Sequence, residues 1–555
     1  MSERDGDGPG TADLLPKTRS PARSKARVGQ RGVLPAVAGG AAVAARAVVA
    51  SPRQPSLVPT AAARSFAAPG TREGRVAVVD AGSNSVRLVV YEGASRAPAV
   101  VFNEKVMCGL GAALADTGHL SPEGRERALR ALGRFAAVAE HLHVATLAGV
   151  ATAAIREAAD GRAFRAEVAR RTGIRLKVAS GADESRLAAS GVLYGNPAAE
   201  GVVVDLGGAS MELCPVSGGR PGTGVTTPLG PLRLAREADP GRAIAAALAK
   251  IGPSLRRPGL RLFLVGGAWR ALARADIERR RYPLKVLHEY TLSGAEARDL
   301  ARFAAGSTPA GLAALDGVSE NRAAAMPMAG RLLRGLVEAL APASVAISAF
   351  GLREGVVYEA MAPGLRAEDP LLAAAAEMER LHGRAPGFGA ELGAWVTGVM
   401  TPNDARERRL MLTACLLADV NWRTHPDHRH QACWEAATRV ALTDLGHDGR
   451  VLLATALAAR YRRPKSATPE TEVAELVTPD ALSRALALGL GMRLGCTLAA
   501  ASPGLLRHCR VEGGGGRFRL ILDGPARELS GEDVDKRFAQ FARALGVESD
   551  GVMAA

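Results

Sequence analysis

A short segment of this sequence occurs twice: residues 78–88 read VVDAGSNSVRL, and residues 203–213 read VVDLGGASMEL. Each copy begins with an apolar run that ends in an aspartate, Asp80 or Asp205, and continues through small residues into a second apolar run. This pattern predicts a strand, a tight turn and a returning strand in both places. Because the copies lie in separate regions of the chain, we expect two lobes of like construction.

The composition of the two turns indicates what they bind. Glycine lets backbone N–H groups approach phosphate oxygens closely, and hydroxyl and amide side chains add further donors. An aspartate beside each turn is suited to hold a hydrated magnesium ion against a phosphate. For either turn alone, the alternative is a plain hairpin whose aspartate caps its own backbone; the spacing shared by both copies favours a phosphoryl-transfer site. The candidate phosphate donors are Gly82, Ser83, Asn84, Ser85, Arg87, Gly207, Gly208 and Ser210, and the candidate metal ligands are Asp80 and Asp205.

The chain divides by pattern into four parts. Residues 1–74 are rich in Ala, Arg, Pro, Ser and Gly without periodicity, which predicts a disordered basic leader. Strand and helix signals then alternate, as is typical of α/β architecture. We therefore expect a first lobe at 75–195, a second lobe at 196–365 and a helical C-terminal domain at 366–555. Within the last part, residues 513–524 predict a hairpin or strand.

The charge and the cysteines of the sequence indicate which partners and which redox compartment suit the protein. The net charge is +15, but residues 1–70 hold ten Lys or Arg against four Asp or Glu, so the rest of the chain carries only +9. The total charge would suit a polyanionic partner, but the folded part is only mildly basic. The six cysteines form no CxxC pair, which favours a reduced, cytoplasmic setting. The longest apolar run near the N-terminus, residues 33–45, is too short to span a bilayer, so we expect no membrane partner.

Further motifs accompany the repeat in a fixed order. ATAAIREA occupies residues 151–158, SGADESRLAASGV 180–192, LVGGAWRALAR 264–274 and SAFGLREGVVYEAM 348–361. Together with the two turn motifs, these segments resemble the exopolyphosphatase and guanosine pentaphosphate phosphohydrolase family. That family shares the fold of actin, Hsp70 and the sugar kinases. The resemblance implies two actin-like (ribonuclease H-like) lobes with a cleft between them.

The resemblance also implies roles for individual residues. Glu184 corresponds to the family's general base on the attacking water, and Arg156 corresponds to an arginine that reaches the phosphate chain. The family's magnesium-associated carboxylates correspond to Asp205 and Glu212, so Mg²⁺ is the implied cofactor, with Mn²⁺ as an alternative. Asp183 is expected only to stabilise the start of its helix.

The helical C-terminal domain resembles the HD-type metal-dependent phosphohydrolases, with one departure. Ala418 precedes Asp419 where the signature has a histidine. Loss of that ligand removes a di-metal centre, so we expect a degenerate HD domain with a structural or polyanion-gripping role. The alternative is a local zinc or manganese site, for which the histidines present are His425, His428 and His430. The cations expected to bind a polyanion are Arg460, Arg462, Arg463 and Lys465.

Two reactions fit these expectations. One is release of the terminal phosphate of inorganic polyphosphate, and the alternative is hydrolysis of the 5′ terminal phosphate of guanosine pentaphosphate; both need the same site. A non-hydrolysing actin-like scaffold that binds another nucleotide is disfavoured by the presence of Glu184, Asp205 and Glu212. We therefore expect a hydrolase acting on phosphoric anhydride bonds, an exopolyphosphatase, which works as a homodimer.

Overall fold

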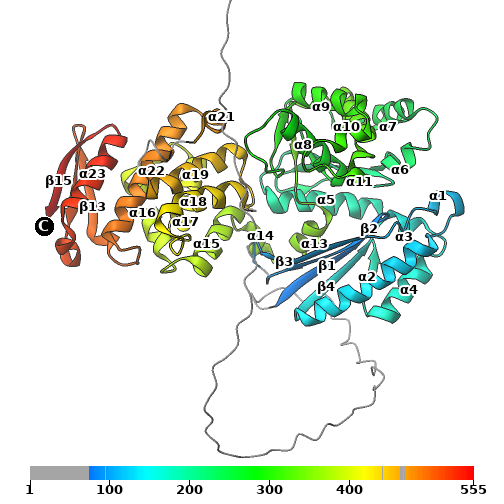
Figure 1. Cartoon of the computed structure of the whole chain (residues 1–555), viewed down its shortest axis with the longest axis horizontal. Helices are drawn as coiled ribbons and strands as arrows, with labels where there is room; N and C mark the ends of the chain where they lie inside the picture. The colour runs from blue at the N-terminus through cyan, green and yellow to red at the C-terminus, as the bar shows by residue number, and fades with distance from the viewer. Residues whose placement is uncertain (1–73, 94, 441, 463–466, 468) are drawn as a thin grey trace, which may run out of the picture. The chain divides into compact units, whose positions relative to one another are not determined.

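The computed structural model describes residues 74–555 except 94, 441, 463–466 and 468 (Figure 1). The leader expected at 1–74 thus lies outside the described residues, apart from Gly74. No helix in the described ranges is both long enough and apolar enough to cross a membrane.

Lobe I is built on a five-stranded sheet in the order β3-β2-β1-β4-β5. Its elements are β1 (Arg75–Ala81), β2 (Ser85–Tyr91), β3 (Val100–Met107), α1 (Leu114–Thr117), α2 (Pro122–His141), β4 (Val144–Ala151), α3 (Ala153–Glu157), α4 (Gly161–Thr172), β5 (Leu176–Val178) and α5 (Gly181–Gly195). β2 runs antiparallel to β1 and β3, whereas β4 runs parallel to β1 and β5. Helices α2 and α4 pack side by side beside this sheet (Figure 1). The alternating strands and helices expected from the sequence therefore form a sheet with helices packed on it.

Lobe II repeats this arrangement. Its elements are β6 (Gly201–Leu206), β7 (Met211–Ser217), β8 (Arg220–Pro221), β9 (Val225–Thr227), α6 (Pro231–Leu234), α7 (Pro240–Leu255), β10 (Arg261–Val265), α8 (Gly267–Arg279), β11 (Thr291–Ser293), α9 (Gly294–Gly306), α10 (Pro309–Ala313), α11 (Glu320–Ala323), α12 (Met326–Leu340), β12 (Ser344–Ile347) and α13 (Leu352–Ala360). β7 is antiparallel to β6 and β9, and β10 is parallel to β6 and β12. β11 adds an antiparallel edge strand beside β12. The same order and directions in both lobes confirm the two-lobed fold that the repeat predicted.

Helices α5 and α13 pack together at unusually close range. A Cβ atom added to Gly355 of α13 would lie 1.9 Å from the Leu187 carbonyl oxygen, and one added to Gly191 of α5 would lie 2.0 Å from the Gly351 carbonyl oxygen. Only glycine permits this backbone-to-backbone contact. The two helices share a buried core with both sheets, to which Val78, Val203 and Phe263 contribute. Because α5 begins at the candidate base, this packing fixes that residue relative to α13.

The C-terminal region has its own apolar core. Its elements are α14 (Pro363–Ala367), α15 (Pro370–His382), α16 (Phe388–Val399), α17 (Ala405–Leu417), α18 (Arg429–Arg439), α19 (His447–Tyr461), α21 (Thr471–Ala474), α22 (Pro479–Leu498), β13 (Cys509–Gly514), β14 (Arg517–Leu522), α23 (Glu532–Ala544) and β15 (Glu548–Ala554). β13 and β14 form the expected hairpin, and β15 adds a parallel strand to β14 that the sequence did not predict. The predicted helical domain is confirmed, with a small sheet at its end.

The C-terminal histidines do not assemble a metal site. Across the described part of the chain, no group of three or more His, Cys, Asp or Glu side chains lies close enough to hold an ion. The Nδ1 atom of His430 instead accepts a hydrogen bond from Nε of Arg462 at 3.2 Å.

The sequence was wrong about Arg460 as a surface cation. Its side chain is buried, and its guanidinium donates to Oδ1 of Asp419 at 2.9 Å and to the thiol of Cys496 at 3.1 Å. Arg460 is therefore part of the domain interior and does not reach a polyanion in solvent. Arg463 and Lys465 lie outside the described residues.

Candidate active site

The two repeated motifs fold into the same hairpin. In the first turn, residues 82–85, the Gly82 N–H donates to the Ser85 carbonyl at 2.9 Å; in the second turn, residues 207–210, the Gly207 N–H donates to the Ser210 carbonyl at 3.0 Å. The sequence repeat is thus a repeat of backbone hydrogen bonding, with β1 and β2 flanking one turn and β6 and β7 flanking the other.

The two turns lie against each other. A Cβ atom added to Gly208 of the second turn would lie 3.8 Å from the Cβ of Ser83 in the first turn. The backbone of the first turn is held from behind, because the carbonyl of Ser83 accepts from the Gly111 N–H at 2.8 Å and that of Asn84 from the Cys108 N–H at 2.9 Å. The predicted phosphate donors of both turns are therefore brought together around one place.

Glu184 lies at the start of α5, beside these turns. Ser180 and Asp183 form a capping box, in which the Asp183 N–H donates to Ser180 Oγ at 3.1 Å and the Ser180 N–H donates to Asp183 Oδ2 at 3.1 Å. Asp183 thus has the helix-stabilising role expected of it. Glu184, by contrast, is only 7% exposed and forms an ion pair with Arg156. Arg156 is oriented in turn by its hydrogen bond to the Ala179 carbonyl at 2.7 Å.

The environment of Glu184 makes it a stronger base than a carboxylate in solvent. Burial raises its pKa above the ordinary value, the contact with Arg156 opposes this rise, and the negative charge of Asp80 adds to it. A raised pKa brings a carboxylate closer to the range in which it accepts a proton from water efficiently. The structure therefore gives Glu184 the surroundings that a general base needs.

Asp205 and Glu212 face each other across β6 and β7. Burial raises the pKa of Asp205 to about 7, with a further contribution from the charge of Glu184. Burial and the charge of Asp205 raise the pKa of Glu212 to about 8. Among the described residues Glu212 Oε1 has no hydrogen-bond partner. Two buried acids that resist ionisation together are suited to a divalent cation, which removes the repulsion between them.

Asp80, the third candidate metal ligand, has cations as its neighbours. Its Oδ2 atom forms an ion pair with Nη1 of Arg353 at 3.2 Å, and its cross-strand neighbour is the cation Arg87. The trio of Asp80, Asp205 and Glu212 does not gather into a metal-binding group in the described part of the structure. The lobe I aspartate is thus neutralised by arginine, whereas the lobe II aspartate faces another acid.

Cations surround the turns, and most of them carried no signal in the sequence. Burial lowers the pKa of Lys105, which stands opposite Arg87 on β3, and the charges of neighbouring arginines lower it further. Those arginines are Arg322, Arg87, Arg270 and Arg353. Burial and the charge of Arg353 lower the pKa of Arg270 to about 10. Burial and neighbouring positive charge thus disfavour the charged forms of Lys105 and Arg270, and an anionic phosphate chain would offset that cost.

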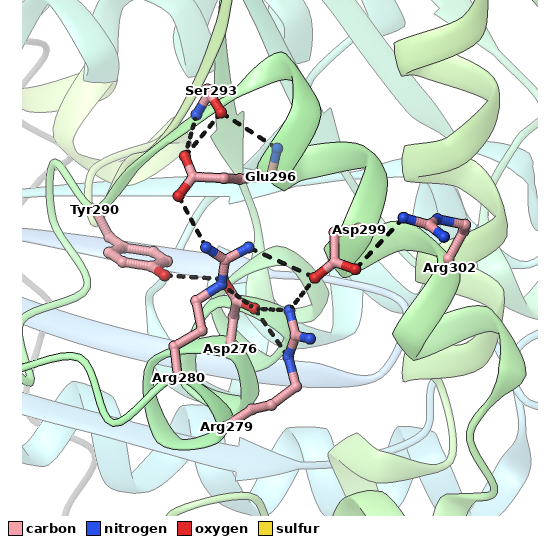
Figure 2. Close-up of polar contacts among 8 residues, drawn as sticks. All are labelled: Asp276, Arg279, Arg280, Tyr290, Ser293, Glu296, Asp299 and Arg302. Atoms are coloured by element: carbon pink, nitrogen blue, oxygen red, sulfur yellow. Dashed lines mark hydrogen bonds and ion pairs between the residues drawn. The ribbon is translucent and has the colours of Figure 1, made fainter.

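An ion-pair cluster around the buried Asp276 holds the helix that carries Arg270 (Figure 2). Asp276 of α8 is fully buried and binds Arg279 at 2.6 Å and the Tyr290 hydroxyl at 2.8 Å. Arg280 joins Asp276 to Glu296 of α9, with a 2.8 Å contact to the glutamate. The cluster ties α8 to α9, so the α8 start next to Asp205 has a fixed position. There, Gly266 has a φ of 125° and approaches the Leu206 carbonyl in a way that a Cβ would block. The neighbouring Trp269 is part of the core, with 0% exposure.

Comparison with known proteins gives matches over both regions. The Ppx/GppA phosphatase family model matches residues 89–363, and a model described as "Exopolyphosphatase, C-terminal" matches residues 371–551. "Exopolyphosphatase 1" of Mycobacterium tuberculosis (strain ATCC 25618 / H37Rv) is 29% identical over 302 residues, which cover 51% of this chain and 87% of that protein. "Exopolyphosphatase 1" of Mycobacterium leprae is 29% identical over 303 residues, covering 51% and 88%.

Solved structures of similar sequence span the same half of the chain. The Ppx/GppA family member of Aquifex aeolicus is 23% identical with a TM-score of 0.46, and the match covers 52% of this chain and 97% of that one. An exopolyphosphatase of Cytophaga hutchinsonii is 23% identical with a TM-score of 0.47, covering 51% and 96%. Since the two family models adjoin and together reach from residue 89 to residue 551, the chain belongs to the Ppx/GppA phosphatase family and is a phosphate-releasing hydrolase.

Proposed function

We propose that this chain releases the terminal phosphate of inorganic polyphosphate, with Glu184 as the general base that activates water. The observation that carries the proposal is the meeting of two phosphate-binding turns at a buried glutamate, within a group of cations. A polyphosphate chain carries a negative charge on every unit, so it complements cations that extend beyond the reacting phosphate. The relatives named exopolyphosphatase support the same substrate class.

The protein's own groups account for binding and proton transfer. The backbone N–H groups of the two turns, together with the side chains of Ser83 and Asn84, bind the terminal phosphoryl group. Arg156 contacts Oε1 of Glu184, which leaves Oε2 to accept a proton from the attacking water. The arginines near the turns offset the charge that develops on the transferred phosphoryl oxygens. Burial of Glu184 raises its pKa and makes the proton transfer more favourable.

The carboxylates of lobe II fit a magnesium ion. Asp205 and Glu212 provide hard oxygen donors, their pKa values are raised by burial and mutual repulsion, and Oε1 of Glu212 has no partner among the described residues. Two carboxylates are a usual protein contribution to a magnesium site, with phosphate oxygens and waters as the other ligands. Bound there, Mg²⁺ or Mn²⁺ supplies positive charge for the phosphoryl oxygens. Asp80 is already paired with Arg353, so we assign the ion to the lobe II pair.

The test is phosphate release from long-chain polyphosphate and from guanosine pentaphosphate, measured side by side with and without Mg²⁺. We expect release from polyphosphate that depends on Mg²⁺ and is lost in Glu184→Gln. Asp183→Asn is the matched control, because it changes the adjacent acid on the same helix turn, whose carboxylate caps the helix at Ser180 and pairs with Arg186. Preference for guanosine pentaphosphate would assign that reaction instead, and release from neither substrate would favour a non-hydrolysing scaffold.

A further inference from the structure

We propose that Arg353 is a positioning residue of this reaction, which fixes the first turn relative to Glu184 by holding Asp80. The inference rests on the proposed function, because it concerns the same site. Arg353 lies on α13, which packs against β1 of lobe I, and Asp80 lies on β1, 273 positions away in the sequence. Their contact therefore ties α13 to the strand that leads into the first turn.

The contact is shielded from solvent. The side chains of Arg353 and Asp80 are 15% and 24% exposed, and Nη1 lies 3.2 Å from Oδ2. Ion pairs held in such surroundings are screened less by water and salt than pairs on the surface. The bridge can thus restrain the end of β1, whose next residues form the first turn.

Arg353 is itself kept in place by its neighbour Glu354. Oε1 of Glu354 accepts from the Tyr91 hydroxyl at 2.9 Å, and Oε2 accepts from the Gly351 N–H at 2.9 Å. Nε of Arg353 lies 3.9 Å from Oε1 of the same carboxylate. Tyr91 is on β2, so Glu354 makes a second connection from α13 to the same hairpin of lobe I. Both oxygens of Glu354 are engaged, which leaves its carboxylate one orientation.

The other end of this linkage is the candidate base. Gly191 and Gly355 let α5 and α13 touch backbone to backbone, so α13 cannot shift without moving α5. Glu184 stands in the first turn of α5. The path from the base to the phosphate therefore runs through α5, α13 and Arg353 to Asp80 and the first turn. Loss of the bridge frees the turn from the base, which lowers the rate of reaction more than the affinity for substrate.

The second copy of the motif supports the role of Arg353, because its aspartate has no such arginine partner in the described part of the chain. At the position of Asp80 the second copy has Asp205, for which the described residues provide no ion pair, and its cross-strand partner is the acid Glu212. The two aspartates occupy the same place in the same hairpin, so the difference lies in their partners. An arginine bridge at only one of them indicates that Asp80 serves to hold the first turn against α13.

The experiment compares kcat and KM for polyphosphate in Arg353→Gln, Arg353→Lys, Asp80→Asn and the double variant Asp80→Asn/Arg353→Gln. We expect Arg353→Gln to lower kcat about 10- to 100-fold with KM within about 3-fold of the parent. Arg353→Lys should recover part of kcat, because lysine restores the charge without the planar fork. The double variant should be no slower than the slower single variant, since both changes break one bridge.

Arg186→Gln is the matched control. Arg186 also joins α5 to α13, through Glu359, but its side chain is 44% exposed and it lies outside the site. We expect its kcat and KM to stay within about 2-fold of the parent, as for an exposed ion pair.

Three results would overturn the inference. The first is an unchanged kcat in Arg353→Gln. The second is a rise in KM of Arg353→Gln with kcat preserved, which would mean that Arg353 contacts the substrate directly. The third is a double variant in which the losses of kcat from the two single variants multiply. If Arg353→Gln does not fold, as judged by its thermal unfolding midpoint, parent values of kcat in both Arg353→Lys and Asp80→Asn overturn it. If the proposed function is wrong, the parent protein will release no phosphate from polyphosphate. If only this inference is wrong, the parent will be active and the kcat and KM values of the variants will not follow the expected pattern.

Discussion

Replacement of Glu212 by glutamine should stabilise the metal-free protein at alkaline pH and leave its stability unchanged in acid. Burial and the charge of Asp205 raise the pKa of Glu212 from 4.5 to about 8. Between these two values the folded state keeps a proton that the unfolded state has released, so the free energy of unfolding falls as the pH rises through this range. One pKa unit corresponds to about 1.4 kcal/mol, so above pH 8 the buried carboxylate costs on the order of 5 kcal/mol. Glutamine does not ionise and avoids this cost.

The assay is urea unfolding in a metal chelator at pH 5 and at pH 9. The variant should gain several kcal/mol over the parent at pH 9 and little at pH 5. Glu140→Gln, on the exposed face of α2, is the matched control and should show no such difference. Addition of Mg²⁺ should stabilise the parent more at pH 9 than at pH 6, because a metal binds the deprotonated carboxylates. A variant that is destabilised at pH 9, or shifted equally at both pH values, would refute the reasoning about Glu212.

Three further predictions concern single residues. Glu184→Gln should lower kcat by about 100-fold or more, because the amide keeps the shape of the side chain but does not accept the proton; a phosphate-release assay checks this, with polyphosphate binding retained. Asp205→Asn should move the Mg²⁺ titration of activity to higher concentration, since a hard cation loses a charged ligand; titration curves that overlay the parent would contradict the assignment. Burial lowers the pKa of His288 from 6.5 to about 4, so its contribution to stability is complete above pH 6.5 and is lost as the pH falls toward 4, by up to about 3 kcal/mol. Urea unfolding at pH 7 and pH 4.5 should show a smaller acid loss in His288→Gln than in the parent.

The local part of the site follows directly from the sequence. Two copies of a strand, a small-residue turn and a returning strand predict two hairpins, and both form with the same closing hydrogen bond. The capping box of Ser180 and Asp183 is also local, which is why the sequence separates the helix-capping acid from Glu184. Such features depend on residues three to five positions apart, where the geometry of a turn or a helix start leaves little freedom.

The long-range contacts of the site could not be predicted from the sequence. Nothing in the GLREG segment shows that Arg353 pairs with Asp80, because the partner is 273 residues away and is brought near only by the packing of α13 on the lobe I sheet. Lys105 belongs to an ordinary edge strand when read alone. The prediction that Arg460 is a surface cation failed for the same reason, since the presence of an arginine in the sequence does not show which side of its helix faces the core.

The repeat explains why one backbone design serves two chemical tasks. Each hairpin places an aspartate before its turn and one side chain directly across from it, which is Arg87 in lobe I and Glu212 in lobe II. A cation at that position makes the lobe I side attractive to phosphate oxygens. An acid at the same position makes the lobe II side attractive to a divalent cation. A phosphate held between the two turns therefore meets direct positive charge on one side and metal-bearing carboxylates on the other. Exchange of the pair, as Arg87→Glu with Glu212→Arg, should abolish phosphate release even though both hairpins keep their backbone, because the new acid would face the bridge of Arg353 and the new arginine would exclude the metal.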